Sequence, residues 1–206
     1  MSHLADRYFI LNKPYNMVSQ FVSTHAVKLL GDINFKFPEG VHAIGRLDNL
    51  SEGLLLLTTN KKITRLLFEA NQPHKRTYVT LVNHTVKEES LEKLRKGIKL
   101  RGKGGNYYTT KPCEVEIIPH PGISFPSSYT MTDKIEFTWL RITLTEGKFH
   151  QVRKMMSAIH HRCKRLIRIS IEDLSLGDLQ PGCIKEIPEA DFFDLLKIDK
   201  SSTISK

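Results

Sequence analysis

Short apolar runs separated by turn residues dominate the sequence, and they predict more strands than helices. Aromatic and β-branched side chains fill residues 7–12, ahead of a turn signal at residues 13–16. Residues 41–58 predict a strand, a polar loop and then a buried strand, because a short apolar run follows glycine and polar residues there. The same reasoning predicts further strands at residues 76–82, 113–118, 137–145 and 164–171.

Helical spacing of apolar residues is confined to a few segments. Residues 61–70, 150–161 and 188–197 each carry apolar side chains on one face of a helix. Thr85 followed by Glu88 resembles a capping box, which predicts that another helix begins there and ends at Gly97. Residues 101–132 are expected to be loops around the strand at 113–118. With strands in the majority and short connections, the pattern favours an α+β fold with a mainly antiparallel sheet.

Composition narrows the partner of this protein to a polyanion. The 206 residues carry a net charge of +9, so we expect a polyanionic partner, either nucleic acid or an anionic membrane surface, and we favour nucleic acid. The apolar runs are far too short to span a bilayer. Solubility alone is the simpler alternative reading of this charge. Three widely spaced cysteines predict a reducing, cytoplasmic setting without disulfides. His160, His161 and Cys163 lack a second ligand cluster, so no metal is expected, and no glycine-rich nucleotide-binding loop is present.

The densest cation cluster contains no acidic residue between Glu146 and Glu172. A solvated helix face usually interleaves acids with its cations, so an acid-free segment favours phosphate contacts over that alternative. The cations that we expect to bind RNA in this segment are Lys148, Lys154, Arg162, Lys164, Arg165 and Arg168, with Arg153 among them.

A second feature is the polar loop Gly45–Gly53, GRLDNLSEG, between two apolar strands. If the loop is extended, Arg46 and Asp48 point to one side and Leu47 points into the core. Such a loop can display a functional site on a rigid scaffold. From the residues alone, an ordinary Arg–Asp surface pair remains the simpler alternative.

This loop and its continuation, GRLDNLSEGLLLLTTN, resemble the signature of the RsuA/RluB/RluE/RluF group of ribosomal RNA pseudouridine synthases. The segments ILNKPYNMVSQF, KRTYVTLV, LTEGKFHQVRKMMSAI and RLIRISIEDLSLGDLQPG resemble the other motifs of that group, in the same order, over about residues 7–187. Within the group the chain is most similar to the large-subunit type E, which lacks a separate RNA-binding domain before the catalytic domain. Phe149, His150 and His161 depart from residues that are common in the group.

The resemblance implies a role for five residues. It implies that Asp48 is the catalytic aspartate, that Tyr78 stacks near the uracil and that Arg153 pairs with the aspartate. It also implies that Arg46 enters the RNA helix when the target uridine is flipped out, and that Val152 lines the pocket. No redox cofactor and no metal is implied, since the reaction only breaks a glycosidic bond, turns the uracil and rejoins it through carbon.

The implied organisation is a single catalytic domain over residues 1–198, with a mainly antiparallel mixed sheet in two lobes and flanking helices. The smaller lobe is expected at about residues 1–60 and the larger at about 61–198, before a flexible tail at 199–206, with no N-terminal RNA-binding domain. The expected partner is 23S ribosomal RNA or a pre-ribosomal particle, bound by a monomer. A non-catalytic ribosome-assembly factor that binds rRNA is the alternative function, and a DNA-binding module fits poorly because no helix-turn-helix or zinc pattern is present.

Overall fold

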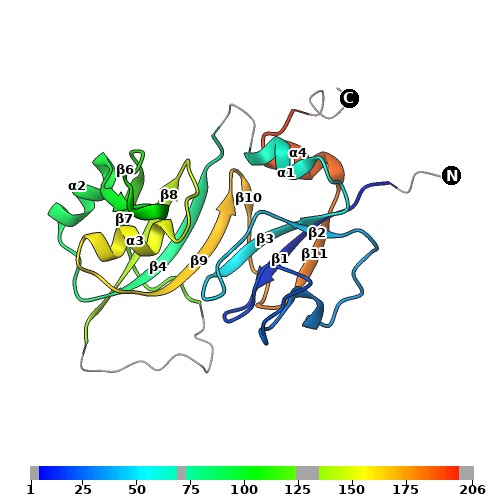
Figure 1. Cartoon of the computed structure of the whole chain (residues 1–206), viewed down its shortest axis with the longest axis horizontal. Helices are drawn as coiled ribbons and strands as arrows, with labels where there is room; N and C mark the ends of the chain where they lie inside the picture. The colour runs from blue at the N-terminus through cyan, green and yellow to red at the C-terminus, as the bar shows by residue number, and fades with distance from the viewer. Residues whose placement is uncertain (1–4, 69–72, 124–134, 200–206) are drawn as a thin grey trace. The chain divides into compact units, whose positions relative to one another are not determined.

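The computed structural model describes residues 5–68, 73–123 and 135–199, and the chain divides into two compact units (Figure 1). The first unit is Met1–His74 with Arg168–Lys206, and the second is Lys75–Ile167. This division differs from the expected lobes, because the last part of the chain belongs with the N-terminal part. Most of the expected tail, residues 200–206, lies outside the described residues.

The first unit is built around strand β3 (Glu52–Thr58), which pairs antiparallel with β1 (Tyr8–Lys13) and with β2 (His42–Ile44). Strand β1 pairs in turn with β11 (Ile184–Ile187), which comes from the far end of the chain. The remaining elements of this unit are η1 (Leu30–Asp32), α1 (Ile63–Phe68), β10 (Leu174–Ser175) and α4 (Glu189–Leu195). Strand β9 (Cys163–Ile171) begins in the second unit and ends in the first, where it pairs with β10.

Both faces of the β1–β3 pair are buried, which explains why these strands are apolar without alternation. On one face, the ring of Tyr8 lies 4.6 Å from that of Phe192 in α4. On the other face, the ring of Phe9 lies 5.8 Å from that of Phe35 in the long connection before β2. The polar residues that occur in these strands therefore lie in the interior, which becomes important at the site.

The second unit is a sheet of β9, β4 (Arg76–Asn83), β8 (Phe137–Leu144) and β7 (Glu114–Ile118), in that order. Strands β4 and β8 pair antiparallel along their full length, and β7 pairs antiparallel with β8. Helices α2 (Glu88–Lys96) and α3 (Gln151–Ala158) bury apolar side chains against this sheet, including Leu91 and Leu94 of α2 and Val152, Met155 and Met156 of α3.

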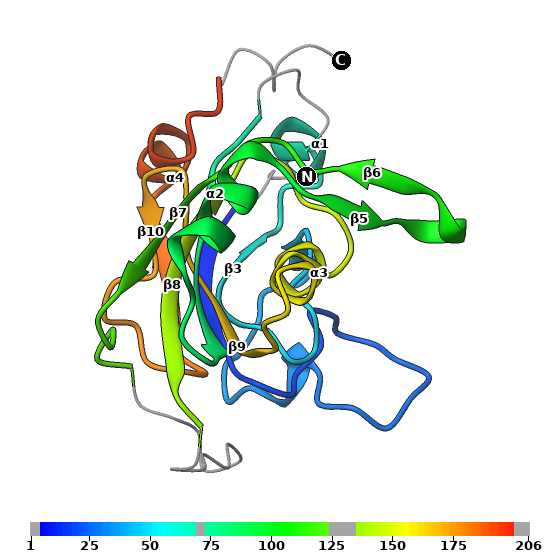
Figure 2. The same ribbon diagram turned by 90° about the vertical axis from the view of Figure 1, so that its left-hand side faces the viewer.

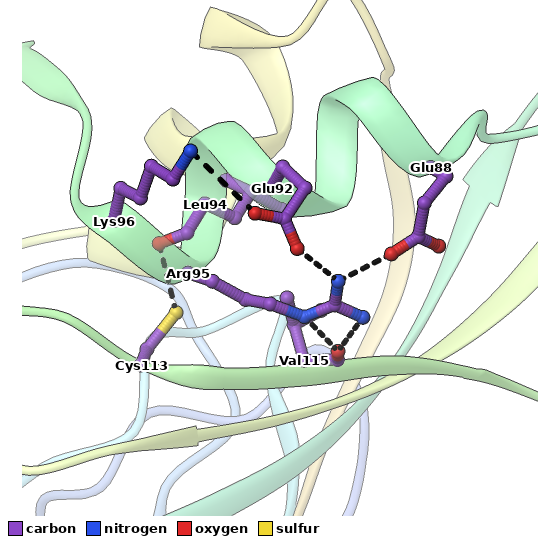
Figure 3. A network of polar contacts seen from close by, with 7 residues as sticks. All are labelled: Glu88, Glu92, Leu94, Arg95, Lys96, Cys113 and Val115. Carbon is purple, nitrogen blue, oxygen red and sulfur yellow. Dashed lines mark hydrogen bonds and ion pairs between the residues drawn. The ribbon is translucent and has the colours of Figure 1, made fainter.

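Helix α2 begins at Glu88, two residues later than the capping-box pattern predicts. Its N-cap is Lys87, and the Thr85 hydroxyl instead donates to the carboxylate of Glu136. Arg95 holds the other end of this helix to β7, because its Nε and Nη2 donate to the carbonyl of Val115 at 3.2 and 2.9 Å (Figure 3). The predicted capping box was therefore wrong, while the predicted end at Gly97 is confirmed.

A small hairpin replaces part of the loop expected over residues 101–132. Strand β5 (Lys99–Arg101) pairs antiparallel with β6 (Tyr107–Thr109), and the short helix η2 (Lys103–Gly105) joins them. The hairpin begins at Gly97, whose φ is +95° and where a Cβ would lie 2.4 Å from the carbonyl oxygen of Thr110. Figure 2 shows the hairpin extending outward from its unit beside α3. Residues 124–134 of the expected loop lie outside the described residues.

The strands that the sequence predicts at residues 7–12, 76–82, 137–145 and 164–171 all form, within one or two residues at each end. The prediction that 41–58 forms a strand, a loop and a buried strand is also confirmed. In the part of the chain that the structure describes, no helix is both long and apolar enough to cross a bilayer.

Candidate active-site loop and basic surface

The Asp48 loop connects β2 to β3 in the first unit, and hydrogen bonds to its backbone hold it in place. Leu47 is buried, and the Ser19 hydroxyl accepts from its backbone N and donates to its backbone O, both at 3.0 Å. The Ser51 backbone N donates to the carbonyl of Asp48 at 2.9 Å, which closes a turn. Asp48 is half-buried and Arg46 is exposed. The prediction that Leu47 points into the core is therefore confirmed.

Lys13 lies beneath this loop with no exposed surface. Its ammonium donates to three backbone carbonyls: Pro14 at 2.8 Å, Met17 at 2.5 Å and Asn49 at 3.4 Å. The Asn49 carbonyl also accepts from the Met17 backbone N at 3.3 Å. One buried cation thus ties the turn after β1 to the residue that follows Asp48.

Charged groups of both signs surround Lys13 inside the first unit. Burial lowers the pKa of Lys13 to about 7, while the carboxylates of Glu52 and Asp48 act to raise that pKa and the Arg168 guanidinium acts to lower it. Glu52 is 4% exposed and Arg168 is 3% exposed, so these charges lie in the interior. We name Lys13, Asp48, Glu52 and Arg168 the buried charge cluster. Burying an unpaired charge costs free energy, so the positive and negative members of this cluster stabilise one another.

Two cations that we expected to contact phosphates are buried instead. Arg168 donates from Nε to the carbonyl of Leu54 at 2.8 Å. Arg165, in the second unit, is 1% exposed, and its carbonyl accepts from the Thr80 hydroxyl at 2.9 Å. The acid-free pattern was therefore misleading for these two residues, because a run of cations does not show which of them point inward along a strand.

The other predicted catalytic residues belong to the second unit, whereas Asp48 belongs to the first. Tyr78 lies on β4 opposite Ile142 and is half-buried against the core beneath α2 and α3. The face of β4 that carries Tyr78 also carries Val82 and packs against these helices. Val152 is 4% exposed and packs in the same core.

Arg153 is half-buried on α3, next to Val152. Its Nη1 lies 3.4 Å from the carbonyl oxygen of Cys163 and 3.7 Å from the Cys163 sulfur. Burial raises the pKa of the Cys163 thiol, and the nearby Arg153 guanidinium opposes that shift. The structure thus places this guanidinium at the edge of the core rather than in open solvent.

The remaining predicted RNA contacts lie at or near the surface. Lys148 and Arg162 are exposed, and Lys154 and Lys164 are half-buried. Among the described residues, no group of three or more His, Cys, Asp and Glu side chains is arranged to hold a metal ion.

Sequence reasoning missed Lys13 and Glu52 as members of the site. Both stand in strands that are otherwise almost entirely apolar, YFILNK and EGLLLLT, and both are fully or almost fully buried. A charged residue in a buried strand is rare unless it is paired, so this was the available signal.

Comparison with known proteins identifies the family of the chain. The family model described as RNA pseudouridylate synthase matches residues 7–158. A ribosomal large subunit pseudouridine synthase E of Vibrio parahaemolyticus is 40% identical over 182 residues, which cover 88% of this chain and 74% of that protein. Another protein of that name, from Xanthomonas axonopodis pv. citri, is 33% identical over 174 residues, 84% of this chain and 89% of that protein.

A solved structure, described as a crystal structure of pseudouridylate synthase, is similar with a TM-score of 0.75 and 25% sequence identity, covering 95% of this chain and 76% of that one. This likeness confirms the α+β fold and the mainly antiparallel sheet expected from the sequence. Because the family model matches well over half of the 206 residues, the chain belongs to the RNA pseudouridylate synthase family.

Proposed function

We propose that this protein is an isomerase that converts a uridine of large-subunit ribosomal RNA into pseudouridine. Membership of the family and relatives named for the large subunit at 40% and 33% identity support this proposal. The net charge of +9 supports a polyanionic substrate. The protein is further proposed to act on 23S RNA or a pre-ribosomal particle, as a cytoplasmic monomer whose residues 1–198 work as one catalytic domain.

The proposed reaction moves one bond and is balanced without a second reactant. The bond from N1 of uracil to the ribose breaks, the base turns, and a bond from C5 to the same ribose carbon forms. The proton lost at C5 is matched by one gained at N1. The protein must therefore supply a reactive carboxylate, a way to hold the freed base, and a way to bring the uridine out of its stack.

Asp48 is the proposed catalytic carboxylate, acting as nucleophile or as general base; both roles need its ionised form. Two features of the first unit support this role. The backbone on both sides of Asp48 is held, by Ser19 at Leu47 and by Lys13 at Asn49. The Lys13 ammonium also lies close enough to interact electrostatically with the Asp48 carboxylate.

The second unit is proposed to supply the groups that hold the base. Arg153 would pair with the carboxylate, Tyr78 would lie against the uracil, and Val152 would line the pocket. Arg153 and Tyr78 are both half-buried, so each has part of its surface available to a ligand, while Val152 is almost covered. Arg46, which is exposed beside Asp48, is proposed to fill the gap that the flipped uridine leaves.

The proposed phosphate contacts are the exposed and half-buried cations of the second unit: Lys148, Lys154, Arg162 and Lys164. Their surface position supports this role, since a phosphate contact needs an ammonium or guanidinium that reaches solvent. Arg165 and Arg168 are omitted because they are buried.

The decisive experiment is a map of pseudouridine in ribosomal RNA from cells that make either the unaltered protein or Asp48→Asn. We expect one pseudouridine to disappear in Asp48→Asn, with a loss of rate on the order of a thousandfold or more in vitro. Asp178→Asn is the matched control, because Asp178 is an exposed carboxylate of the same unit.

Two outcomes would contradict these proposals. An unchanged map in Asp48→Asn would remove Asp48 from catalysis. If no pseudouridine depended on the protein at all while rRNA binding persisted, the alternative of a non-catalytic assembly factor would replace the enzyme.

A further inference from the structure

The β5–β6 hairpin and the start of α3 form one surface of the second unit. Lys154 of α3 donates from Nζ to the carbonyl of Arg101 in β5 at 3.2 Å, which fixes the helix beside the hairpin. Figure 2 shows the two elements next to each other, with the hairpin reaching outward. The position of the hairpin is therefore fixed at two points, at its start near Gly97 and at its contact with α3.

Two aromatic side chains of this surface are unusually exposed. Phe149 is 72% exposed and Tyr107 is 64% exposed, although apolar rings of this size are normally covered. The ring of Phe149 stacks on that of His150, with centroids 3.8 Å apart and an angle of 17° between the planes. Because this ring stack is open to solvent, a further planar group can stack on it.

A lysine accompanies each aromatic ring of this surface. Nζ of Lys99 lies 5.1 Å from the ring centre of Tyr107, and Nζ of Lys154 lies 5.5 Å from that of Phe149. Lys148 lies 4.5 Å from the ring centre of Tyr108, which is half-buried at the root. Each of these rings therefore has a cation beside it, and the pair of Tyr107 with Lys99 lies on the face of the hairpin opposite Tyr108.

Acidic side chains are scarce around this surface. Residues 97–113 and 147–171 contain no Asp or Glu. The nearby Glu146 is engaged at the root of the hairpin, where its Oε1 accepts from the Lys111 backbone N at 2.9 Å and from Gln151 Nε2 at 2.7 Å. Within the described residues, no carboxylate forms an ion pair with Lys99, Lys148 or Lys154, so these ammonium groups can meet phosphates.

We propose that the part of this surface beside α3, which we name the stacking surface (Lys148, Phe149 and Lys154), binds an unpaired segment of the RNA. An unpaired base adds to the Phe149–His150 stack, and the two lysines contact the adjoining phosphates. Exposed rings with cations beside them are the combination by which proteins bind single-stranded nucleic acid. A duplex keeps its bases stacked on one another, so it would gain nothing from exposed rings.

This inference rests on the proposed function for the identity of the RNA, but its test does not depend on turnover. The full chain is titrated with a single-stranded RNA oligonucleotide that contains 2-aminopurine, and with the same oligonucleotide annealed to its complement. Fluorescence anisotropy reports affinity, and quenching of 2-aminopurine reports stacking on a ring. The variants are Phe149→Ala and Phe149→Trp, with Ile117→Ala as the control because Ile117 is 49% exposed on β7 of the same unit.

We expect Phe149→Ala to lose the quenching and to weaken single-strand binding about tenfold, while duplex binding stays within about twofold. Phe149→Trp should restore both signals, and Ile117→Ala should match the unaltered chain. The inference is overturned if Phe149→Ala retains the quenching, if it weakens single-strand and duplex binding equally, or if the unaltered chain does not bind the oligonucleotide.

Conversion of uridine in ribosomal RNA is measured on the same preparations to separate this inference from the proposed function. If the unaltered chain makes pseudouridine but Phe149→Ala binds single strands normally, only the stacking surface is wrong. If the unaltered chain makes none, the proposed function fails, whatever the stacking signal shows.

Discussion

The buried cations of the first unit and the exposed cations of the second unit have different roles. In the first unit Lys13 and Arg168 are buried with Glu52, and their donors point at backbone carbonyls of the protein itself. In the second unit Lys148 and Arg162 are exposed. A buried cation fixes the chain around it because its bonds cannot be exchanged for water, whereas an exposed cation remains available to a ligand. The buried charge cluster of the first unit is therefore structural, and the exposed cations of the second unit are suited to binding.

Lys13→Met tests the structural role of the buried cations in the first unit, and of the variants considered it should have the largest effect on stability. It leaves the carbonyls of Pro14, Met17 and Asn49 without their donor and removes a cation from the buried charge cluster. We expect the free energy of unfolding to fall by about 4 kcal/mol, as when one partner of a buried ion pair is removed. Urea unfolding measures this change.

The control for this variant is Lys185→Met, since Lys185 is exposed on β11 of the same unit. It should change the free energy of unfolding by less than about 0.5 kcal/mol. Equal stability of the two variants would show that the buried ammonium of Lys13 is not needed to hold the loop.

The pH dependence of stability gives the next largest effect. The pKa of Lys13 is about 7 in the folded chain and close to its ordinary 10.5 in the unfolded chain. Between these values the unfolded chain holds a proton that the folded chain has released, so raising the pH through this window favours the folded state. The stability of the unaltered protein relative to Lys13→Met should therefore rise by about 1.4 kcal/mol for each pH unit inside the window. A constant difference, measured by urea unfolding at several pH values, would contradict the lowered pKa.

Arg162→Ala tests the second side of the comparison and should have the smallest effect. Because Arg162 is exposed, stability should be unchanged, and RNA affinity should fall about threefold. The slope of log affinity against log salt should become shallower by about 0.8 for one lost phosphate contact. Lys93→Ala, an exposed change on α2, should leave both the affinity and the slope unchanged. A loss of stability without a change in slope would mean that Arg162 is a structural cation after all.

The sequence predicted those elements whose apolar pattern is long and regular. The buried strand at Leu54–Leu57, the paired strands β4 and β8, and helix α3 follow from burial of one or both faces, and they form where expected. The hairpin of β5 and β6 was missed because each strand has only three residues and the segment between them is rich in glycine. Hydrogen bonds between Ile98 and Thr110 rather than an apolar pattern define it.

The site was only partly accessible from the residues. Spacing predicted that Leu47 anchors the loop, yet the roles of Asp48, Tyr78 and Arg153 came from the resemblance and remain predictions. Charge counting could not show that Arg168 points inward, since the face of a strand on which a side chain lies depends on register and on what covers that face. A tertiary arrangement such as the buried charge cluster joins residues more than a hundred positions apart.

The first unit is completed by both ends of the described chain, and this affects the order in which it can form during synthesis. Residues 75–167 are synthesised before Arg168 and β11. Until those are made, β1 lacks its neighbour on one edge, and the charges around Lys13 lack their guanidinium. The loop that carries Asp48 would therefore reach its final surroundings only after the last part of the chain has been made.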